Sequence, residues 1–531
     1  MDINSDHFEP AAGLSQDERG EIHAVLNRIR PGEGPGRWHD LPDQVRVLRR
    51  MHGGRGGCEV FEVEVLWGTQ RLSHVAKLGP AHQLKDEFQA YFKYLDKKAS
   101  GLFAPIRAAS EGVIDAAQAV PGQREAVVYG HASQFTGTPG VRPETFETVA
   151  AQAIRRHDAS VDAAVSILTR LFEGIGPNLY ACHSREDLDQ NLLPAWNLRL
   201  GPDLVVEVDR LADKRFLPAG DLSEQDLTRA ECYPLNVLES AARHDAQKIR
   251  PGMLVHLRNL TAVWWGDQLM AEALEHDLRV EVLAPRGRRI RDLAAGLKEG
   301  DLLRVCGRVR SVQARACRER LLAGLPDFGV RKGTLSGPDA EVPDPFDLLP
   351  AVLETRRPGR WTALVHGDMN PRNVLVVAGR PCLIDYALTK DGEPLLADFV
   401  RLEGTLARDV LPEDLSWAQL VRLERLLAAA CRLDDEAAER FAARLAKDRA
   451  ELGAAFRIFW AIRRAARETY PQEDRDGWWR DYLEQLFLFA HISLKWDNPS
   501  PQALRATAAM AGAAAEVLAP HEAFLVHPAE A

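Results

Sequence analysis

The stretch that most constrains the fold runs from Leu364 to Glu403, where three short apolar runs are separated by polar turns. The runs read LVHGD, NVLVV and PCLID. They predict a strand, a polar loop, and a hairpin whose second strand ends at an aspartate. In this layout Asp368 and Asn373 share one loop, and Asp385 follows the neighbouring strand. We therefore expect three oxygen-bearing side chains to converge.

Such a convergence suits phosphoryl transfer from ATP. Mg²⁺ binds carboxylate, amide, water and phosphate oxygens, and the attacking hydroxyl needs one more carboxylate to orient it. We assign the catalytic role to Asp368 and the metal-binding role to Asn373 and Asp385. Protein kinases use the comparable motifs H-R-D-x-x-x-x-N and D-F-G.

The chain departs from protein kinases at two places. Gly367 replaces the loop arginine, and Asp385-Tyr386-Ala387 replaces D-F-G. The segments HGDMNPRNVLV, LIDYALT and ADFVRLE instead resemble the aminoglycoside and choline kinase group. More narrowly, they resemble the ternary complex associated phosphotransferase-type domain of predicted bacterial conflict systems. The resemblance covers residues 45–515 and implies a protein-kinase-like fold, ATP and Mg²⁺ as cofactors, and a hydroxyl acceptor.

Three further polar residues of this stretch have other interpretations. His366 is expected to brace the loop by hydrogen bonding, and Asp398 is expected to brace the loop or a helix start. Arg372 either reaches a phosphate or is a solvated loop arginine.

A glycine-rich segment lies upstream, before alternating apolar and charged residues that predict a β-hairpin. Without a Cβ, glycine lets backbone amides approach phosphates closely. The segment is either a lid over the nucleotide phosphates or a plain turn, and the motif at 364–403 favours the lid. We expect the preceding residues 41–50 to form a helix. The candidate nucleotide-binding glycines are Gly53, Gly54, Gly56 and Gly57.

Lys77 ends the next predicted strand in HVAKLG and resembles the lysine that contacts the α and β phosphates in kinases. Glu87, in a predicted helix, is its expected ion-pair partner, although Asp86 is adjacent. The alternative for Lys77 is a solvated lysine at a strand end. Further along, EAVVYGHA predicts a strand leading into a hinge, where Val128, Tyr129 and Gly130 are expected to contact the adenine.

Residues 249–325 change from helical to strand periodicity, which predicts an inserted domain. The pattern LKEGDLLRVCGRVR resembles part of a small OB-type barrel, a fold that binds oligonucleotides or oligosaccharides. Residues 249–332 carry a net charge of +6 in a chain whose net charge is −10. The arginines at 286, 288, 289 and 291 either bind a polyanion or are solvated. Trp264 and Trp265 either stack on bases or belong to the core, and the core is favoured.

The 531-residue composition is that of an ordinary soluble protein. No apolar stretch is long enough to cross a membrane and MDINSDHFEP has no signal-peptide features, so we expect a cytoplasmic protein without membrane association. Seven scattered cysteines without a C-x-x-C pair indicate neither a zinc site nor a disulfide framework.

The expected fold is α+β: a bilobal protein-kinase-like fold with a mostly helical large lobe and an inserted small OB-like β-barrel. The expected parts are an N-terminal helical appendage (1–45), a small lobe and hinge (46–135), the helical start of the large lobe (136–248), the insert (249–325), the catalytic large lobe (326–520) and a tail (521–531).

We predict an ATP- and Mg²⁺-dependent phosphotransferase acting on an unidentified hydroxyl acceptor. A protein partner in a multi-component system would fit the resemblance. Two alternatives stay open. One is a nucleotide-gated binding module without turnover, and the other is a nucleic-acid-binding adaptor that acts through the insert.

Overall fold

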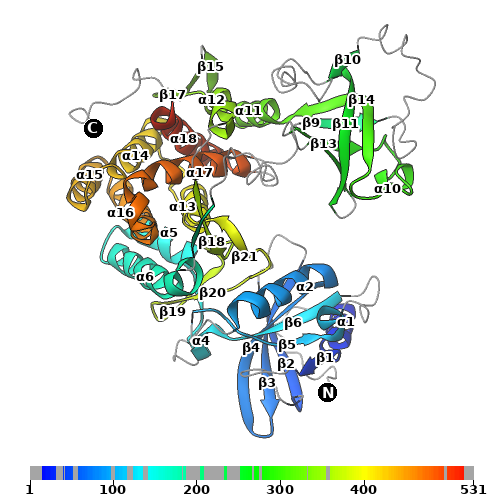
Figure 1. The fold of residues 1–531 in the computed structure, drawn as a ribbon. Coiled ribbons are helices and arrows are strands. Elements are labelled where there is room, and N and C mark those ends of the chain that lie inside the picture. Colours follow the sequence, from blue (N-terminus) through cyan, green and yellow to red (C-terminus); the bar gives the residue numbers. More distant parts are fainter. Residues whose placement is uncertain are drawn as a thin grey trace. The chain divides into compact units, whose positions relative to one another are not determined.

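The computed structural model (Figure 1) describes most of the chain. It forms two compact units, one comprising Met1–Glu186, Arg360–Asp414 and Ala429–Tyr482 and the other the remaining segments. The described residues are 15–31, 40, 42–51, 58–96, 102–115, 124–135, 141–181, 183–186, 204–208, 232–235, 252–265, 268–273, 278–331, 333–354, 359–494 and 499–519.

The first unit contains a six-stranded antiparallel sheet in the order β1-β5-β6-β4-β3-β2. Buried residues alternate along β2, β3 and β4, so one face of these strands is buried, whereas β6 is buried along nearly its whole length. Helix α2 (Ala81–Ala90) contacts β4 and β6 and continues into a π-helical turn at Tyr91–Leu95. The strands are β1 (Ile29–Pro31), β2 (Gln44–Met51), β3 (Glu59–Trp67), β4 (Gln70–Pro80), β5 (Ile106–Ser110) and β6 (Arg124–Gly130).

The N-terminal segment contributes to this sheet and its core. Helix α1 (Gln16–Leu26) buries Ile22, Val25 and Leu26 in the same cluster as Phe61 of β3. The helix expected at 41–50 is wrong, because residues 44–50 belong to strand β2. Val45 and Val47 alternate with less buried residues there, and this period of two decides for a strand.

The predicted strand, loop and hairpin are present in the same unit. Strand β18 (Arg360–Val365) leads into the polar loop, and β19 (Val374–Val377) and β20 (Arg380–Leu383) form the hairpin. Strand β21 (Lys390–Pro394) returns to pair with β18, and β8 (Ser184–Glu186) pairs with the other edge of β18. A short strand β7 (Glu144–Thr145) joins β19.

Helices of the first unit pack against the hairpin. Helix α6 (Ser160–Ile175) contacts β20, α5 and α16. From residue 397 onwards the described chain is mainly helical, as predicted. The other helices are α3 (Glu111–Ile114), α4 (Ala132–Phe135), α5 (Phe146–Arg156), a π turn at Gly176–Tyr180, α13 (Ala397–Asp409), α14 (Trp417–Ala430), α15 (Asp435–Asp448), α16 (Ala450–Thr469), a 3-10 turn at Gln472–Gly477, α17 (Trp478–Ser493) and α18 (Pro501–Leu518).

The second unit contains a β domain, by which we mean strands β9 to β14 together with helix α10 (Ile290–Leu293). Its sheet has the order β10-β11-β12-β13-β9-β14, with an additional pairing between β11 and β14. The strand periodicity predicted within 249–325 is present as β11 to β14, and β9 and β10 come from further upstream. The strands are β9 (Leu204–Val208), β10 (Cys232–Leu235), β11 (Leu254–Trp265), β12 (Gln268–Ala273), β13 (Leu278–Leu283) and β14 (Leu302–Val312).

The rest of the second unit includes helices and a three-stranded sheet. Helix α11 (Gln313–Gly324) follows β14 and contacts α12 (Pro345–Glu354) and α18. Strands β15 (Gly329–Arg331), β16 (Thr334–Ser336) and β17 (Glu341–Pro343) form the sheet. The protein therefore has a mixed α+β fold with a helical C-terminal region. Among the helices described, none is long and apolar enough to span a bilayer.

Candidate active site

The polar loop after β18 has a backbone that only glycine fits comfortably at one position. Gly367 has a φ of +78°, and a Cβ there would overlap the carbonyl oxygen of Leu388. A larger residue at this position, such as the arginine of protein kinases, would meet the same overlap. Asp385 has a φ of +67°, an uncommon conformation for a residue with a side chain. Such conformations persist where the surrounding structure fixes them, often at functional sites.

Asp398, at the start of α13, fixes the loop by hydrogen bonds to its backbone. Its Oδ2 accepts hydrogen bonds from the backbone N–H of His366 at 2.7 Å and from the Tyr180 hydroxyl at 3.0 Å, while its Oδ1 accepts from the N–H of Gly367 at 2.9 Å. Asp398 is fully buried. Its carboxylate therefore fixes the two residues that precede Asp368, which is the bracing role that the sequence suggests.

The structure brings Asp368 and Asn373 together. The Asn373 Nδ2 donates to the backbone oxygen of Asp368 at 2.9 Å and to its Oδ2 at 3.1 Å. Asn370 shapes the turn between them, because its Oδ1 accepts from the backbone N–H groups of Arg372 and Asn373 at 3.0 and 3.2 Å. The loop thus fixes the Asp368 carboxylate by short-range contacts.

Lys77, Glu87 and Asp385 form a charged cluster in the same unit. The Lys77 Nζ lies 2.8 Å from Glu87 Oε2 and 3.3 Å from Asp385 Oδ1. Burial acts to lower the pKa of Lys77, but the carboxylates of Glu87 and Asp385 outweigh it and raise the pKa. The lysine is therefore a permanent cation here. Glu87 is buried whereas the adjacent Asp86 is exposed, which resolves the ambiguity between them.

Tyr386 anchors the segment that carries Asp385. Its hydroxyl donates to the backbone oxygens of Leu383 at 2.7 Å and Ala104 at 2.9 Å, and its N–H donates to Glu87 Oε1 at 3.3 Å. His366 is fully buried, packs edge-on against the Tyr386 ring, and donates from Nε2 to the Ile384 oxygen at 3.1 Å. These bonds fix both ends of the turn into Asp385.

The residues expected at the adenine lie in strand β6. Val128 packs into the core of the six-stranded sheet, and the Tyr129 ring lies 6.4 Å from that of Tyr386. Both residues pair with β4 and β5, so they sit inside the sheet. The backbone N–H of Gly130 donates to Pro105 at 2.9 Å. The glycines at 53, 54, 56 and 57 lie outside the described residues.

Asn373 and Asp385 have the donor types that Mg²⁺ requires. The Asn373 side chain bonds Asp368 through its nitrogen, so the amide oxygen is the atom that can face a cation. One carboxylate and one amide oxygen are a suitable protein contribution, because Mg²⁺ in nucleotide sites takes its other ligands from phosphates and water. The residues present therefore fit the metal.

Four contacts of this loop and of Asp398 are not predicted by the sequence. Arg401 of α13 forms an ion pair with Asp368 Oδ1, and Tyr180 binds Asp398. Arg372 pairs with Glu147 and with Asp409, which lies 3.3 Å away, so it ties the loop to α5 and α13. A signal for Arg401 exists in ADFVRLE, because it follows Asp398 by one helical turn. Tyr180, in a π turn, has no comparable signal.

The β domain has its own candidate residues. Trp264 packs against the domain core, and its Nε1 donates to the Leu297 oxygen at 3.1 Å. The Arg291 guanidinium lies 5.0 Å from the centre of this ring. These contacts favour the core interpretation of Trp264. The side chain of Trp265 lies outside the described residues, and the arginines at 286, 288, 289 and 291 are all exposed.

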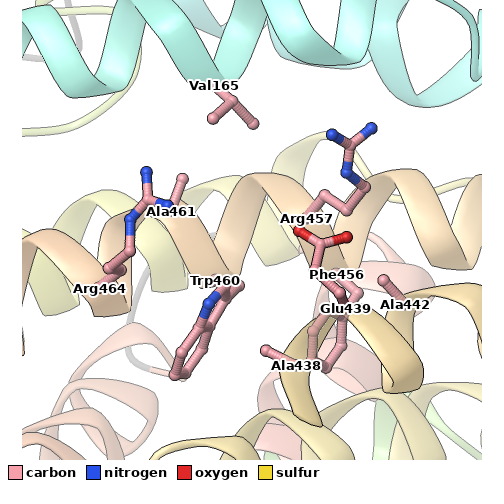
Figure 2. A pocket seen from close by; sticks show the side chains of 9 residues that line it. All are labelled: Val165, Ala438, Glu439, Ala442, Phe456, Arg457, Trp460, Ala461 and Arg464. Atoms are coloured by element: carbon pink, nitrogen blue, oxygen red, sulfur yellow. The ribbon is translucent and has the colours of Figure 1, made fainter. Parts of the chain in front are cut away.

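A separate pocket is lined by residues of α6, α15 and α16 (Figure 2). Trp460 lies along its wall and donates from Nε1 to Asp435 Oδ1 at 3.2 Å, while Arg457 pairs with Asp162 at 2.6 Å. The polar groups of Trp460 and Arg457 thus interact with other side chains of the protein. None of the predicted site residues lines this pocket.

Comparison with known proteins gives a family. A glucosamine kinase structure (crystal form B) is 12% identical and covers 96% of this chain and 98% of that chain, with a TM-score of 0.31. A thermostable mutant of an aminoglycoside phosphotransferase, in a ternary complex with ADP and hygromycin B, is 10% identical and covers 89% of this chain and 94% of that chain, with a TM-score of 0.29. At such scores the superpositions alone establish no shared fold.

No curated protein matches the chain. The model of ternary complex associated domain 9 matches residues 43–495, which is most of the sequence. The resemblance to ternary complex associated domains is therefore confirmed, and the chain belongs to the ternary complex associated domain 9 family.

Proposed function

We propose that this protein is an ATP- and Mg²⁺-dependent phosphotransferase that phosphorylates a hydroxyl group. The observation that carries the proposal is the Lys77 cluster, in which one partly buried cation lies 2.8 Å from the buried Glu87 and 3.3 Å from Asp385. Kinases use this lysine, helix glutamate and metal-binding aspartate together. A solvated lysine at a strand end would not require two carboxylate partners.

In the proposed reaction the acceptor hydroxyl oxygen attacks the γ-phosphorus of ATP. The bond between that phosphorus and the oxygen bridging to the β-phosphate breaks, and ADP leaves with the electron pair. The hydroxyl proton goes to Asp368, whose carboxylate is oriented by Asn373. Phosphoryl transfer depends mainly on positioning and charge stabilisation, so the fixed loop is the main contribution of the chain.

The remaining contacts would hold the nucleotide. Lys77 would bind the α and β phosphates, and Mg²⁺ held by Asn373 and Asp385 would neutralise charge on the phosphates when bound. Because the backbones of Val128 and Tyr129 pair within the sheet and the Gly130 N–H donates to Pro105, we propose that adenine contacts the chain just after β6, from His131 onwards. The glycine-rich segment 53–57 remains the proposed lid.

The test is ATP turnover by the purified protein with Mg²⁺, with and without added RNA or DNA. Asp368→Asn and Asp385→Asn should each lower turnover by about a thousandfold or more, because each removes one role of a unit that acts together. Lys77→Met should chiefly weaken productive ATP binding. The matched control is Asp391→Asn, since this aspartate is exposed on β21.

Substantial turnover in either site variant would contradict the enzyme assignment. Nucleotide binding without turnover in the wild-type protein would favour the second candidate, a nucleotide-gated binding module. In that case the protein would have no acceptor, and a partner would recognise its nucleotide-bound state.

A further candidate activity concerns the β domain. We propose that it is an OB-type barrel that binds a polyanion, either as a specificity element or as an adaptor. The pairings link β11, β12, β13, β9, β14 and β11 again in turn, which supports a barrel. The exposed arginines at 286, 288, 289 and 291 support the ligand class.

The family name refers to ternary complexes. We propose that the protein works with a protein partner in a multi-component system of the conflict or defence type. The partner would be tested by co-purification in the presence and absence of Mg²⁺ and ATP, with Asp385→Asn as the comparison.

A further inference from the structure

Arg401 is placed by the same helix that braces the polar loop. It follows Asp398 by three residues in α13, so both side chains lie on one helix face. Asp398 binds the N–H groups of His366 and Gly367 at 2.7 and 2.9 Å. The helix is therefore fixed against the loop next to Asp368, and Arg401 is directed to that residue.

The two carboxylate oxygens of Asp368 have different partners. Asn373 Nδ2 donates to Oδ2 at 3.1 Å, and the guanidinium of Arg401 pairs with Oδ1. The side chains of Arg401 and Asp368 are 27% and 20% exposed, so the pair is neither buried in the core nor freely solvated. Oδ2 thus has an amide donor, and Oδ1, which accepts no hydrogen bond among the described residues, has the Arg401 cation beside it, so rotation of the carboxylate is restricted.

A second ion pair in the unit shows what a structural pair looks like here. Arg463 and Glu403 are both fully buried, the Arg463 Nε lies 2.9 Å from Glu403 Oε2, and the Tyr482 hydroxyl donates to the same oxygen at 2.6 Å. Arg401, in contrast, keeps a buried Nε with no hydrogen-bond acceptor among the described residues. Its partner is a proposed catalytic group on the loop.

We propose that Arg401 is a positioning residue of this site, which together with Asn373 fixes the orientation of the Asp368 carboxylate toward the acceptor hydroxyl. This inference rests on the proposed phosphotransferase function. A loose phosphoryl-transfer transition state gains more from an oriented nucleophile than from a strong base, so a carboxylate held by a guanidinium is suited to the task. Arg401 acts through Asp368 and does not itself react.

The experiment compares wild type, Arg401→Ala, Arg401→Lys and the control Arg440→Ala, which removes an exposed ion pair on α15. The readouts are kcat and KM for Mg-ATP turnover, the melting temperature, and turnover with added methylguanidinium. We expect Arg401→Ala to lower kcat by about 10–100-fold with less than about a twofold change in KM. Methylguanidinium should restore part of the loss, Arg401→Lys should be intermediate, and Arg440→Ala should match wild type.

The other outcomes are equally informative. Unchanged turnover in Arg401→Ala would overturn the inference and leave the phosphotransferase assignment intact. Increased turnover would also overturn it, because the ion pair would then be a latch that blocks Asp368. Parallel changes in kcat, KM and melting temperature without rescue would indicate a merely structural pair. If Arg401→Ala does not fold, Arg401→Lys carries the test, and wild-type kcat in that variant overturns the inference. A wild-type protein without turnover would overturn the function and this inference with it.

Discussion

The loop and hairpin of residues 360–409 and the β domain are both built from short strands, but they are assembled differently. In the hairpin region, the polar residues Asp368, Asn373 and Asp385 follow one another along the chain and are fixed by local bonds and by α13. In the β domain, strand β9 (Leu204–Val208) pairs with β13 and β14, which come much later in the sequence. Site residues that lie close together along the chain can be recognised from the sequence. Strand pairings between distant segments cannot.

The comparison also separates two uses of polar side chains. In the hairpin region buried polar groups, such as Asp398 and His366, hold backbone groups in place. In the β domain the arginines of the segment after β13 remain exposed, and the core consists of apolar side chains with the edge of Trp264 bonded to Leu297. The first region is therefore expected to be sensitive to small changes, and the second tolerant.

The largest effect is expected from Gly367→Ala. A positive φ alone costs about 1–2 kcal/mol for a residue with a Cβ, and here the Cβ would also overlap the backbone of Leu388. We expect a loss of more than ~3 kcal/mol in unfolding free energy and at least about a hundredfold in turnover. Denaturant unfolding and ATP turnover measure the two effects.

Gly392→Ala is the matched control for this prediction. Gly392 has a φ of +75°, and nothing lies within 4 Å of a Cβ placed there. It should show only the conformational cost, about 1 kcal/mol, with normal turnover. Equal effects of the two substitutions would mean that the close approach of Gly367 to Leu388 does not constrain the loop.

The sequence predicts the coarse α+β architecture, the helical C-terminal region and the polar loop, because these follow from local periodicity and from turn residues. It also predicts the ion pair between Lys77 and Glu87, whose Nζ and Oε2 atoms lie 2.8 Å apart. It does not predict Tyr180 as a partner of Asp398, because that contact depends on how a π turn packs. Strand β9 is also missed, because the strands it pairs with, β13 and β14, lie far from it in the sequence. The helix expected over residues 41–50 is wrong because charged residues obscure the alternation of Val45 and Val47.

A moderate effect is expected from acid. Burial lowers the pKa of His74, in the first unit, and of His491, in the second, to about 4 in each case. The ordinary value is near 6.5, so each neutral histidine contributes stability above that pH, and this is lost as the pH falls from 6.5 toward 4. Each loss should reach up to ~3 kcal/mol below the folded pKa. Calorimetry between pH 7 and pH 4 measures it.

Single substitutions assign this acid effect to one unit at a time. His74→Asn should reduce the pH dependence of the transition that Mg-ATP stabilises, and His491→Asn should reduce that of the other transition. The amide keeps a donor near the position of Nδ1, which binds Leu72 in one case and Phe487 in the other. If either variant altered both transitions equally, the two units would unfold together, and the contrast between them would not extend to stability.

The smallest effect on turnover is expected from the double substitution Arg286→Ala and Arg288→Ala. Both arginines are exposed, so unfolding free energy should change by less than about 0.5 kcal/mol and turnover by less than about twofold. Binding of a single-stranded oligonucleotide should weaken, and the slope of log affinity against log salt should fall by up to ~1 for each arginine. Arg331→Ala, an exposed arginine on β15, is the control. Unchanged oligonucleotide binding would contradict the proposal that the β domain binds a polyanion. Lost turnover would be more consequential, because it would show that the β domain completes the catalytic site and that the two regions act as one.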